Sequence, residues 1–330
     1  MANKATTAVF CTYEPNIKER VFIRGRFDRL QSIAPLHPVI VSPDNFDKEA
    51  PNLSEVEAVF STWGMWNPTE EQFAQLPKLK AVFYAAGATD GFARTFLSRG
   101  IAVHSAWKAN AIPVAEFVFS QIILGLKGFF RNVLDLKTGG RSRWGGENSS
   151  WTGEGAYHET VALLGNGEIS RVVQKFLELT DVDVILIPSR PQNRTMSFEE
   201  AFKVATVVSN HLPDRTDNKK CITKEMLASM KEGAVFINTG RGAQIDERGM
   251  IEVAIARPDL TFLLDVTSPE PPVEGDPLYT LPNVQLTRHI AGSINGECAR
   301  MADFMMDDYL RWKKGEPTLY QVTESMLLTS

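Results

Sequence analysis

Cysteine is scarce in this chain of 330 residues, which contains only Cys11, Cys221 and Cys298. Three widely spaced cysteines cannot supply the framework of a disulfide-rich protein. They fit a reducing compartment, so we expect a cytoplasmic protein. No cluster of cysteine and histidine has the spacing of a zinc site, and we therefore expect no bound metal.

Long apolar runs and blocks of positive charge are also missing. No uninterrupted apolar stretch reaches the ~18 residues that a membrane-spanning helix needs. The formal net charge is −5, and lysine and arginine are dispersed, so nothing favours a nucleic-acid partner. Strand-like residues begin at Ala8, which leaves no room for a signal peptide. The expected partners are small molecules rather than membranes or nucleic acids.

The chain is long enough for two domains, and short apolar runs alternate with helical stretches in both halves. Within the first ~105 residues we predict strands at 8–11, 39–41, 58–61, 81–85 and 102–104, and helices near 17–33, 68–76 and 91–99. In the second series we predict strands at 161–164, 184–187, 205–208, 234–238, 261–265 and 284–286, and helices at 223–231, 247–256 and about 295–313. This alternation predicts two doubly wound, Rossmann-like domains with parallel sheets.

The segment from Pro113 to about Lys137 is apolar nearly all round. Pro113 suits the first turn of a helix, and the only strong helix breakers after it are Gly125 and Gly128. A helix with no polar face has to be buried, either between domains or between subunits. We therefore predict one long helix here and a homodimer built partly on it.

A glycine turn follows the first strand of the second series. Gly165 and Gly167 lie between an apolar run and a segment with helical spacing, and another strand follows after a helix-length gap. In such a βαβ unit the glycines let the backbone approach a pyrophosphate, and the helix N-terminus binds its charge. The third glycine of the usual pattern is Ser170 here. We predict a dinucleotide contact at Gly165, Asn166, Gly167, Glu168 and Ile169.

Three polar residues follow three later strand-like runs: Arg241, Glu270 and His289. Arginine binds a carboxylate with its planar fork. Histidine transfers protons near neutral pH, and a nearby glutamate favours its charged form. Each residue alone could be structural or solvated, but the ordered set downstream of a dinucleotide turn predicts a catalytic site.

These motifs resemble the D-isomer-specific 2-hydroxyacid dehydrogenase family over nearly the full chain. The resemblance rests on 238–242 (NTGRG), on Asp265-Val266 followed by Glu270-Pro271, on 289–292 (HIAG), and on 210–213 (NHLP) and 230–234 (MKEGA). It implies a substrate domain at 1–108 plus 296–330, a dinucleotide-binding domain at 109–295, and an active-site cleft between them. It also implies a dimer that packs through the helix connecting the domains.

The same resemblance implies roles for individual residues. Arg241 would bind the substrate carboxylate together with the backbone of Gly87 and Ala88. Glu270 would support His289, the acid/base, and Asp265 would hold the nicotinamide carboxamide. The remaining cofactor contacts implied are His211, Leu212, Pro213, Thr239, Gly240 and Gly292.

Several residues depart from the family pattern. Arg288 stands where proline is usual before the histidine, and Lys108 lies in a stretch that lacks the common glycine. Each is either a solvated surface charge or the contact for a second anionic group of the substrate. Trp63 and Trp66 crowd an early loop, as interdomain packing or as pocket walls.

The residues at the end of the second strand of the nucleotide domain indicate which cofactor is preferred, NAD(H) or NADP(H). An NAD-binding fold places a carboxylate there to hold the ribose 2′-hydroxyl. This chain has Pro188, Ser189 and Arg190 instead, with Arg194 nearby. A hydroxyl and a guanidinium bind a 2′-phosphate better than an acidic group does, so NADP(H) is favoured over NAD(H), although both could be accepted.

The sequence therefore predicts an NAD(P)-dependent oxidoreductase that interconverts a 2-oxo acid and a D-2-hydroxy acid, most similar to glyoxylate/hydroxypyruvate reductases. The alternative is a non-catalytic nucleotide sensor or corepressor of the same fold. Retention of Arg241, Glu270 and His289 favours the enzyme.

Overall fold

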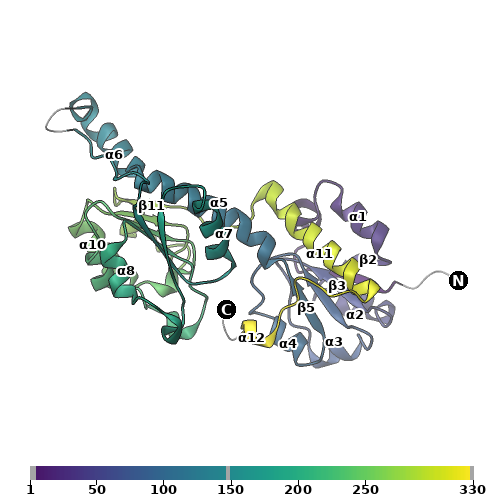
Figure 1. Ribbon diagram of the computed structural model, residues 1–330. Coiled ribbons are helices and arrows are strands. Elements are labelled where there is room, and N and C mark those ends of the chain that lie inside the picture. Colours follow the sequence, from purple (N-terminus) through teal and green to yellow (C-terminus); the bar gives the residue numbers. More distant parts are fainter. Residues whose placement is uncertain (1–4, 146–148, 328–330) are drawn as a thin grey trace. The chain divides into compact units, whose positions relative to one another are not determined.

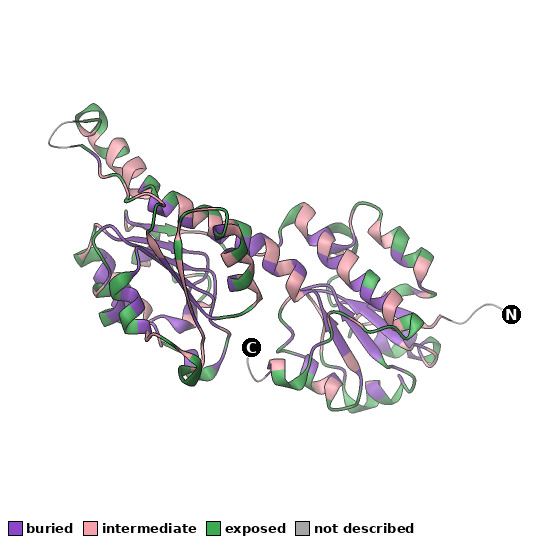
Figure 2. Ribbon diagram, viewed as in Figure 1, coloured by how far each residue is buried: buried purple, intermediate pink, exposed green. Residues whose placement is uncertain are grey.

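The computed structural model describes residues 5–145 and 149–327. They form two compact units (Figure 1). The first unit comprises Met1–Ala111 and Ser293–Ser330, and the second comprises Ile112–Gly292. Each unit is a parallel sheet with buried strands and helices whose outer faces are exposed, as Figure 2 shows. The prediction of two doubly wound α/β domains is confirmed.

The sheet of the first unit has the strand order β2-β1-β3-β4-β5, and all its pairs are parallel. Its strands are β1 (Thr7–Phe10), β2 (Leu36–Val41), β3 (Ala58–Ser61), β4 (Ala81–Tyr84) and β5 (Ala102–Ser105). The shorter helices are α2 (Phe46–Glu49), η2 (Ala50–Asn52), α3 (Glu70–Ala74) and α4 (Ala93–Leu97). The predicted strands agree with these to within a few residues.

The helix predicted at 17–33 is two helices. A π-helical turn, η1 (Asn16–Val21), ends before Arg24 and Gly25, and α1 (Arg26–Ile33) begins after them. Arg24 has φ 54° and Gly25 has φ 77°. A helix cannot continue through left-handed residues, so the prediction of one helix was wrong here.

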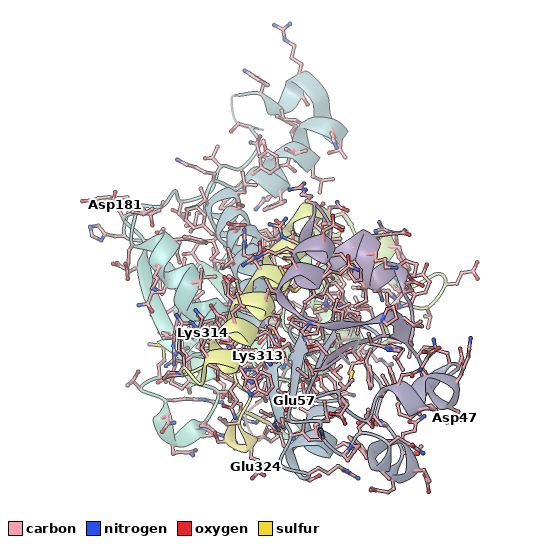
Figure 3. The ribbon with its side chains drawn as sticks, turned by 90° about the vertical axis from the view of Figure 1, so that its right-hand side faces the viewer. Asp47, Glu57, Asp181, Lys313, Lys314 and Glu324 are labelled. Atoms are coloured by element: carbon pink, nitrogen blue, oxygen red, sulfur yellow. The ribbon has the colours of Figure 1, made fainter. Side chains whose placement is uncertain are left out.

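The C-terminal helix α11 (Cys298–Lys314) packs on the first unit's sheet, although it is far from that sheet in sequence. Its buried face includes Met301, Met305 and Tyr309, and Gly315 caps it in the left-handed region as predicted. The short elements η8 (Asn295–Glu297) and α12 (Glu324–Leu327) flank it. Figure 3 labels Glu57 and, at the end of α11, Lys313 and Lys314. Glu57 receives a hydrogen bond from Lys80, and this bond together with the charges of Lys80 and Lys313 lowers the pKa of the glutamate.

The sheet of the second unit has the strand order β11-β10-β9-β8-β6-β7, again all parallel. Its strands are β6 (Thr160–Leu164), β7 (Asp183–Ile187), β8 (Val207–Asn210), β9 (Val235–Asn238), β10 (Thr261–Leu264) and β11 (Val284–Leu286). The α-helices that alternate with these strands are α7 (Glu168–Leu177), α8 (Phe198–Val204), α9 (Lys224–Ala228) and α10 (Glu247–Ala256). Single turns occur at η4 (Pro191–Asn193), η5 (Thr216–Asn218), η6 (Gly242–Gln244) and η7 (Pro277–Tyr279).

Both sheets follow one connection pattern, because the second strand of each lies outside the first and the third lies on the other side. The order reverses between β1 and β3 in the first unit and between β6 and β8 in the second. In open α/β sheets, ligands bind outside the carboxyl ends of the strands at such a reversal.

The long helix predicted from Pro113 to about Lys137 is also two helices. The first, α5 (Trp107–Leu126), begins earlier than predicted, so Pro113 lies inside it rather than in its first turn. The second, α6 (Phe129–Gly139), begins after Gly128, whose φ of 69° ends the first, and η3 (Gly140–Arg143) follows. The apolar pattern continues through this break, which is why periodicity alone did not reveal it.

Helix α5 is long and apolar enough to cross a membrane by length and composition alone, a test that core helices of soluble proteins also pass. Half of its apolar stretch is buried inside the protein. Val114, Val118 and Ile122 pack in one cluster with Val161 and Val235 of the second unit's sheet. One face of α5 therefore covers the core of the second unit, while burial of the rest between domains or subunits stays a prediction.

Candidate active site

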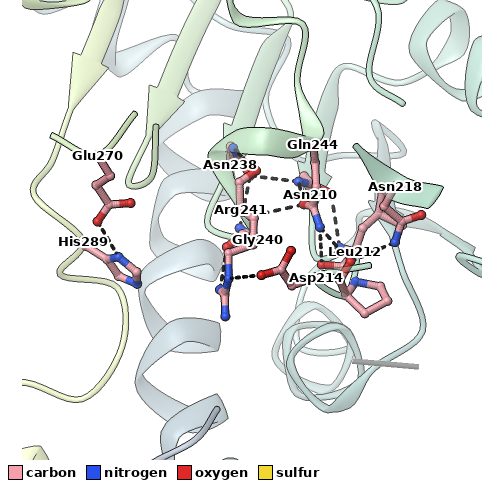
Figure 4. A network of polar contacts seen from close by, with 11 residues as sticks. Asn210, Leu212, Asp214, Asn218, Asn238, Gly240, Arg241, Gln244, Glu270 and His289 are labelled. Carbon is pink, nitrogen blue, oxygen red and sulfur yellow. Dashed lines mark hydrogen bonds and ion pairs between the residues drawn. The ribbon is translucent and has the colours of Figure 1, made fainter. Parts of the chain in front are cut away.

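The three predicted catalytic residues follow three adjacent strands. The sheet places β9, β10 and β11 side by side, and Arg241, Glu270 and His289 come after them in that order. Because the strands are parallel, their carboxyl ends meet at one edge of the sheet. Figure 4 shows Arg241 and the His289–Glu270 pair at this edge.

His289 and Glu270 form a hydrogen-bonded pair in which Nδ1 and Oε1 are 2.7 Å apart. The side chain of His289 is 53% exposed and that of Glu270 is 42% exposed. The glutamate fixes the imidazole by one ring nitrogen, so Nε2 is left for a reacting group. His289 has φ 55°, an uncommon conformation for a non-glycine residue and one that is found where a site holds a side chain in a required direction.

Buried Asp265 holds the loop that carries His289. Its carboxylate accepts hydrogen bonds from the backbone N–H groups of Ile290 at 2.7 Å and Ala291 at 2.9 Å, and from the hydroxyl of Thr287 at 2.7 Å. Its carbonyl accepts from the N–H of His289. These bonds assign Asp265 a positioning role that the sequence did not reveal. The predicted contact with a nicotinamide carboxamide stays a prediction.

The loop that carries Glu270 packs closely on the turn after β9. A side chain at Gly242 would lie 2.0 Å from the carbonyl carbon of Thr267, so only glycine fits there. The N–H of Ser268 donates to Glu247, whose pKa is raised by burial. The loop is therefore held against the residue that follows Arg241.

Arg241 contacts two acceptors. Its Nη1 donates to the carbonyl of Gly240 at 2.9 Å, and its Nε lies 3.5 Å from Oδ2 of Asp214. The Asp214 carboxylate occupies the kind of position that a bound carboxylate would take on this guanidinium. The side chain is part-exposed, so a ligand can reach it.

A buried amide network joins the ends of β8 and β9 (Figure 4). Asn210 Nδ2 donates to Asn238 Oδ1 at 2.9 Å and to Gln244 Oε1 at 2.7 Å, and Gln244 donates to the carbonyls of Leu212 and Pro213. Gln244 also accepts from the N–H of Arg241. From the sequence, Asn210 and Asn238 were recognised only as parts of the motifs at 210–213 and 238–242, and no role was assigned to them or to Gln244.

The glycine turn predicted to bind a dinucleotide connects β6 to α7, at the reversal of strand order. Gly165 has φ 104°, and a Cβ there would lie 2.5 Å from the carbonyl oxygen of His211. Gly167 is the N-cap of α7 and has open space around the position of a Cβ. Asn166, Glu168 and Ile169 lie on this turn and the first turn of α7. The geometry matches a strand-to-helix turn that binds phosphate.

These two glycines give a matched pair of variants. Gly165→Ala should lower the free energy of unfolding by several kcal/mol, because it adds a steric clash to a backbone conformation that costs alanine ~1–2 kcal/mol. Gly167→Ala should fold normally, because its φ is −89° and its Cβ meets nothing, but should bind dinucleotide more weakly. Denaturant unfolding and calorimetric titration with NADPH distinguish the two effects. Equal stability of both variants would contradict this account.

Two predicted cofactor contacts have buried polar atoms that lack partners within the described residues: Nδ1 of His211 and Oγ1 of Thr239. Burial lowers the pKa of His211 to about 3, so its imidazole is neutral near pH 7, and Nε2 bonds to Ser209. Buried polar atoms are normally hydrogen-bonded. Ligand groups at the ends of β8 and β9 would satisfy them, so the residues present fit a dinucleotide.

The end of β7 is surrounded by more charged residues than the sequence around 188–194 predicts. Ser189, Arg190 and Arg194 are there as predicted, but a turn far along the chain adds Arg215 and Asp217. The Asp217 carboxylate therefore lies near the end of β7, although residues 188–190 themselves include no acidic residue. That the Ser189 hydroxyl and the Arg190 guanidinium bind a phosphate stays a prediction.

Gly87 and Ala88 belong to the first unit, in the loop that follows β4, and border a cavity of about 230 Å³. Ser105 Oγ donates to the carbonyl of Gly87 at 2.7 Å, and a Cβ at Gly87 would lie 3.4 Å from the side-chain amide of Asn110. The backbone N–H groups of Gly87 and Ala88 were predicted to bind a carboxylate, which stays a prediction.

The structure shows the contacts of the four residues for which the sequence allowed two interpretations. The guanidinium carbon of Arg20 lies 4.1 Å from the ring centre of Trp63. The ring of Trp66 stacks on that of Phe10, with 4.9 Å between the ring centres, so both tryptophans pack within the first unit. Lys108 lies 5.9 Å from the ring of Tyr320. Arg288 is exposed and lines a cavity of about 530 Å³ together with Glu270, His289, Tyr279 and Leu286.

The remaining predicted cofactor residues lie at the same edge of the second unit's sheet. Leu212 and Pro213 follow β8, Gly240 follows β9, and Gly292 follows the loop of His289. Within the described residues no group of three metal-ligating side chains comes together.

A family model described as D-isomer specific 2-hydroxyacid dehydrogenase, NAD binding domain, matches residues 126–291. A hydroxypyruvate reductase of Thermotoga maritima is 29% identical over 202 residues, which are 59% of this chain and 64% of that protein, less than two thirds of its length. A glyoxylate/hydroxypyruvate reductase B of Pectobacterium carotovorum is 25% identical over 307 residues, 89% of this chain and 92% of the relative.

Solved structures show the same fold. A glyoxylate reductase of Paecilomyes thermophila superposes with a TM-score of 0.72 over 98% of this chain and all of that chain, at 22% identity. The family model covers half of the chain, and the fold agrees over nearly all of it. The chain belongs to the D-isomer specific 2-hydroxyacid dehydrogenase family.

Proposed function

We propose that this protein reduces a small 2-oxo acid to the D-2-hydroxy acid with a nicotinamide cofactor, and catalyses the reverse oxidation. The observation that carries the proposal is the His289–Glu270 pair at the sheet edge where Arg241 also lies. Family membership supports the reaction class. Glyoxylate and hydroxypyruvate are the first candidates, because relatives bear those names.

Arg241 binds and orients the substrate carboxylate. In the free protein the Arg241 guanidinium is near Asp214, and a substrate carboxylate replaces that contact with a bidentate one. The same positive charge stabilises the negative charge that develops on the carbonyl oxygen during reduction.

His289 supplies the proton to that oxygen through Nε2. Glu270 holds Nδ1–H, which fixes the tautomer and stabilises the charged imidazole before transfer. When bound, the reduced nicotinamide supplies the hydride to the carbonyl carbon. In oxidation His289 accepts the hydroxyl proton instead.

The proposed cofactor is NADP(H), with NAD(H) as the second possibility. Arg190 lies at the end of β7, where a 2′-phosphate would bind. Arg190→Ala should raise KM for NADPH about tenfold and change KM for NADH less than twofold, because one charge-assisted contact is lost with only one cofactor. Steady-state kinetics with both cofactors test this, and a wild-type preference for NADH would overturn it.

We propose a homodimer that uses α5 and α6. Helix α6 has no buried residue among those described, and its Phe129 is 45% exposed. An apolar helix surface of this kind is covered by a second copy in many oligomers. Sedimentation at micromolar concentration should show a dimer, and Phe129→Asp should shift it to monomer. Leu179→Asp, at another exposed apolar residue of the second unit, is the control. A monomeric wild type would refute the proposal.

The proposed location is the cytoplasm. The three cysteines are free, and burial raises the pKa of the Cys221 thiol to about 11, which keeps it protonated and unreactive.

A further inference from the structure

The turn at 213–218 carries an arginine that is almost fully buried and is bound at both ends. The side chain of Arg215 is 7% exposed. Its Nε and Nη2 donate to the two carboxylate oxygens of Asp217 at 2.7 and 2.5 Å, and its Nη1 donates to Oγ of Ser189 at 3.2 Å. Arg215 therefore links a turn after β8 to the end of β7, 26 residues away.

This link determines what the Ser189 hydroxyl can do. A serine hydroxyl has one hydrogen to donate and two lone pairs to accept with. A guanidinium can only donate, so one lone pair of Ser189 is used by Arg215, and the hydroxyl hydrogen is available for an acceptor. A phosphate dianion offers only acceptors, and an O–H bond to it is roughly twice as strong as one to a neutral group.

The backbone of Ser189 is fixed as well. Arg194 donates through Nη2 to the Ser189 carbonyl at 2.7 Å and through Nε to the Pro188 carbonyl at 3.0 Å. Its guanidinium lies 3.6 Å from the ring centre of Phe198. The serine is thus held from both sides before any ligand binds.

The charges around Ser189 also match a phosphate. Arg190, Arg194 and Arg215 carry three positive charges, and Asp217 carries one negative charge, with its Oδ2 also 3.8 Å from Nη1 of Arg190. Hydrogen bonding to Arg215 lowers the pKa of Asp217, so its carboxylate stays ionised. The exposed carboxylate of Glu199 also acts on Arg194. The cluster is still net positive, opposite in sign to the ~1.5 to 2 negative charges of a phosphomonoester near pH 7.

We propose that Arg215, held by Asp217, is a positioning residue that makes the Ser189 hydroxyl a donor to the 2′-phosphate of NADP(H). The proposal rests on the cofactor preference proposed above and names the residue through which Ser189 acts. Arg215 acts on the phosphate through Ser189, so its loss should be felt only by the phosphorylated ligand.

The test measures calorimetric binding of 2′,5′-ADP and of 5′-AMP, which lacks only the 2′-phosphate, to the full-length protein and requires no turnover. The wild type should bind 2′,5′-ADP at least about thirtyfold more tightly. Ser189→Ala should reduce that ratio about tenfold, which corresponds to one hydrogen bond to a charged group. Arg215→Lys should reduce it as much, because a single ammonium cannot hold Asp217 and Ser189 together as a planar fork does.

The double variant separates a positioning role from an independent contact. If Arg215 acts through Ser189, the Ser189→Ala/Arg215→Lys protein loses about tenfold, not about a hundredfold. Arg248→Lys, at an exposed arginine of the same unit, is the matched control and should leave the ratio unchanged. Thermal unfolding checks that each variant is folded, and Ser189→Ala keeps the test usable if Arg215→Lys is not.

Three results would overturn the proposal: an additive loss in the double variant, equal losses for both nucleotides in Arg215→Lys, or no wild-type preference for 2′,5′-ADP. The last would also remove the NADP(H) preference, but 2-oxo acid reduction measured with NADH would be unaffected. Failure here is thus distinguishable from failure of the proposed reaction.

Discussion

Replacing His289 by alanine is expected to lower kcat by about 10²–10⁴-fold, which is the usual loss when a positioned proton donor is removed. Cofactor affinity should change little, because the Nδ1 of His289 bonds to Glu270 and its loop is held by the carboxylate of Asp265 rather than by the imidazole. The measurement is steady-state reduction of 2-oxo acids beside calorimetric binding of NADPH.

A second histidine provides the control for this variant. His158 also pairs with a carboxylate on the second unit, since its Nδ1 is 3.5 Å from Asp183, and it is exposed. His158→Ala should keep wild-type turnover. If His289→Ala retained most of its activity, His289 would not be the acid/base.

Replacing Arg241 by lysine is expected to lower kcat/KM for 2-oxo acids roughly 10- to 100-fold while cofactor affinity stays within about twofold. A lysine keeps the charge but loses the planar fork, and hydrogen bonds to charged groups contribute ~1.5–3 kcal/mol each. The N–H of residue 241 would still donate to Gln244, so the turn after β9 should keep its structure.

The effect of Arg241→Lys should divide between KM and kcat. A loss confined to KM would mean that Arg241 binds substrate and transition state equally, whereas a loss in both fits stabilisation of the developing charge. Arg248→Lys serves again as the control for the arginine-to-lysine change itself. Unchanged KM and kcat would refute the assignment.

The strands could be predicted from sequence because each is a short apolar run, buried in a parallel sheet, with a polar or glycine-rich turn after it. The helices were predicted less well where a backbone conformation, rather than a pattern, ends them. Gly128 and the pair Arg24 and Gly25 adopt positive φ, and nothing in the surrounding apolar pattern requires that. Pro113 inside α5 shows the converse, because a proline did not mark the helix start.

The catalytic residues of the candidate site could be predicted from sequence, because each has a distinctive chemistry and follows a strand-like run. Arg241, Glu270 and His289 each follow an apolar run, and the sheet brings their strand ends to one edge. The supporting contacts join positions far apart in sequence. Asn210 to Gln244, Arg215 to Ser189 and Asp265 to Ile290 depend on which strands become neighbours, which a single sequence does not state.

The most direct test of the proposed reaction is oxidation of NADPH and NADH by the purified protein with glyoxylate, hydroxypyruvate and pyruvate. We expect turnover that depends on the 2-oxo acid, is faster with NADPH, and is lost in His289→Ala. Tight cofactor binding with no turnover across a broad panel of 2-oxo acids would contradict the proposed reaction and would favour a nucleotide sensor.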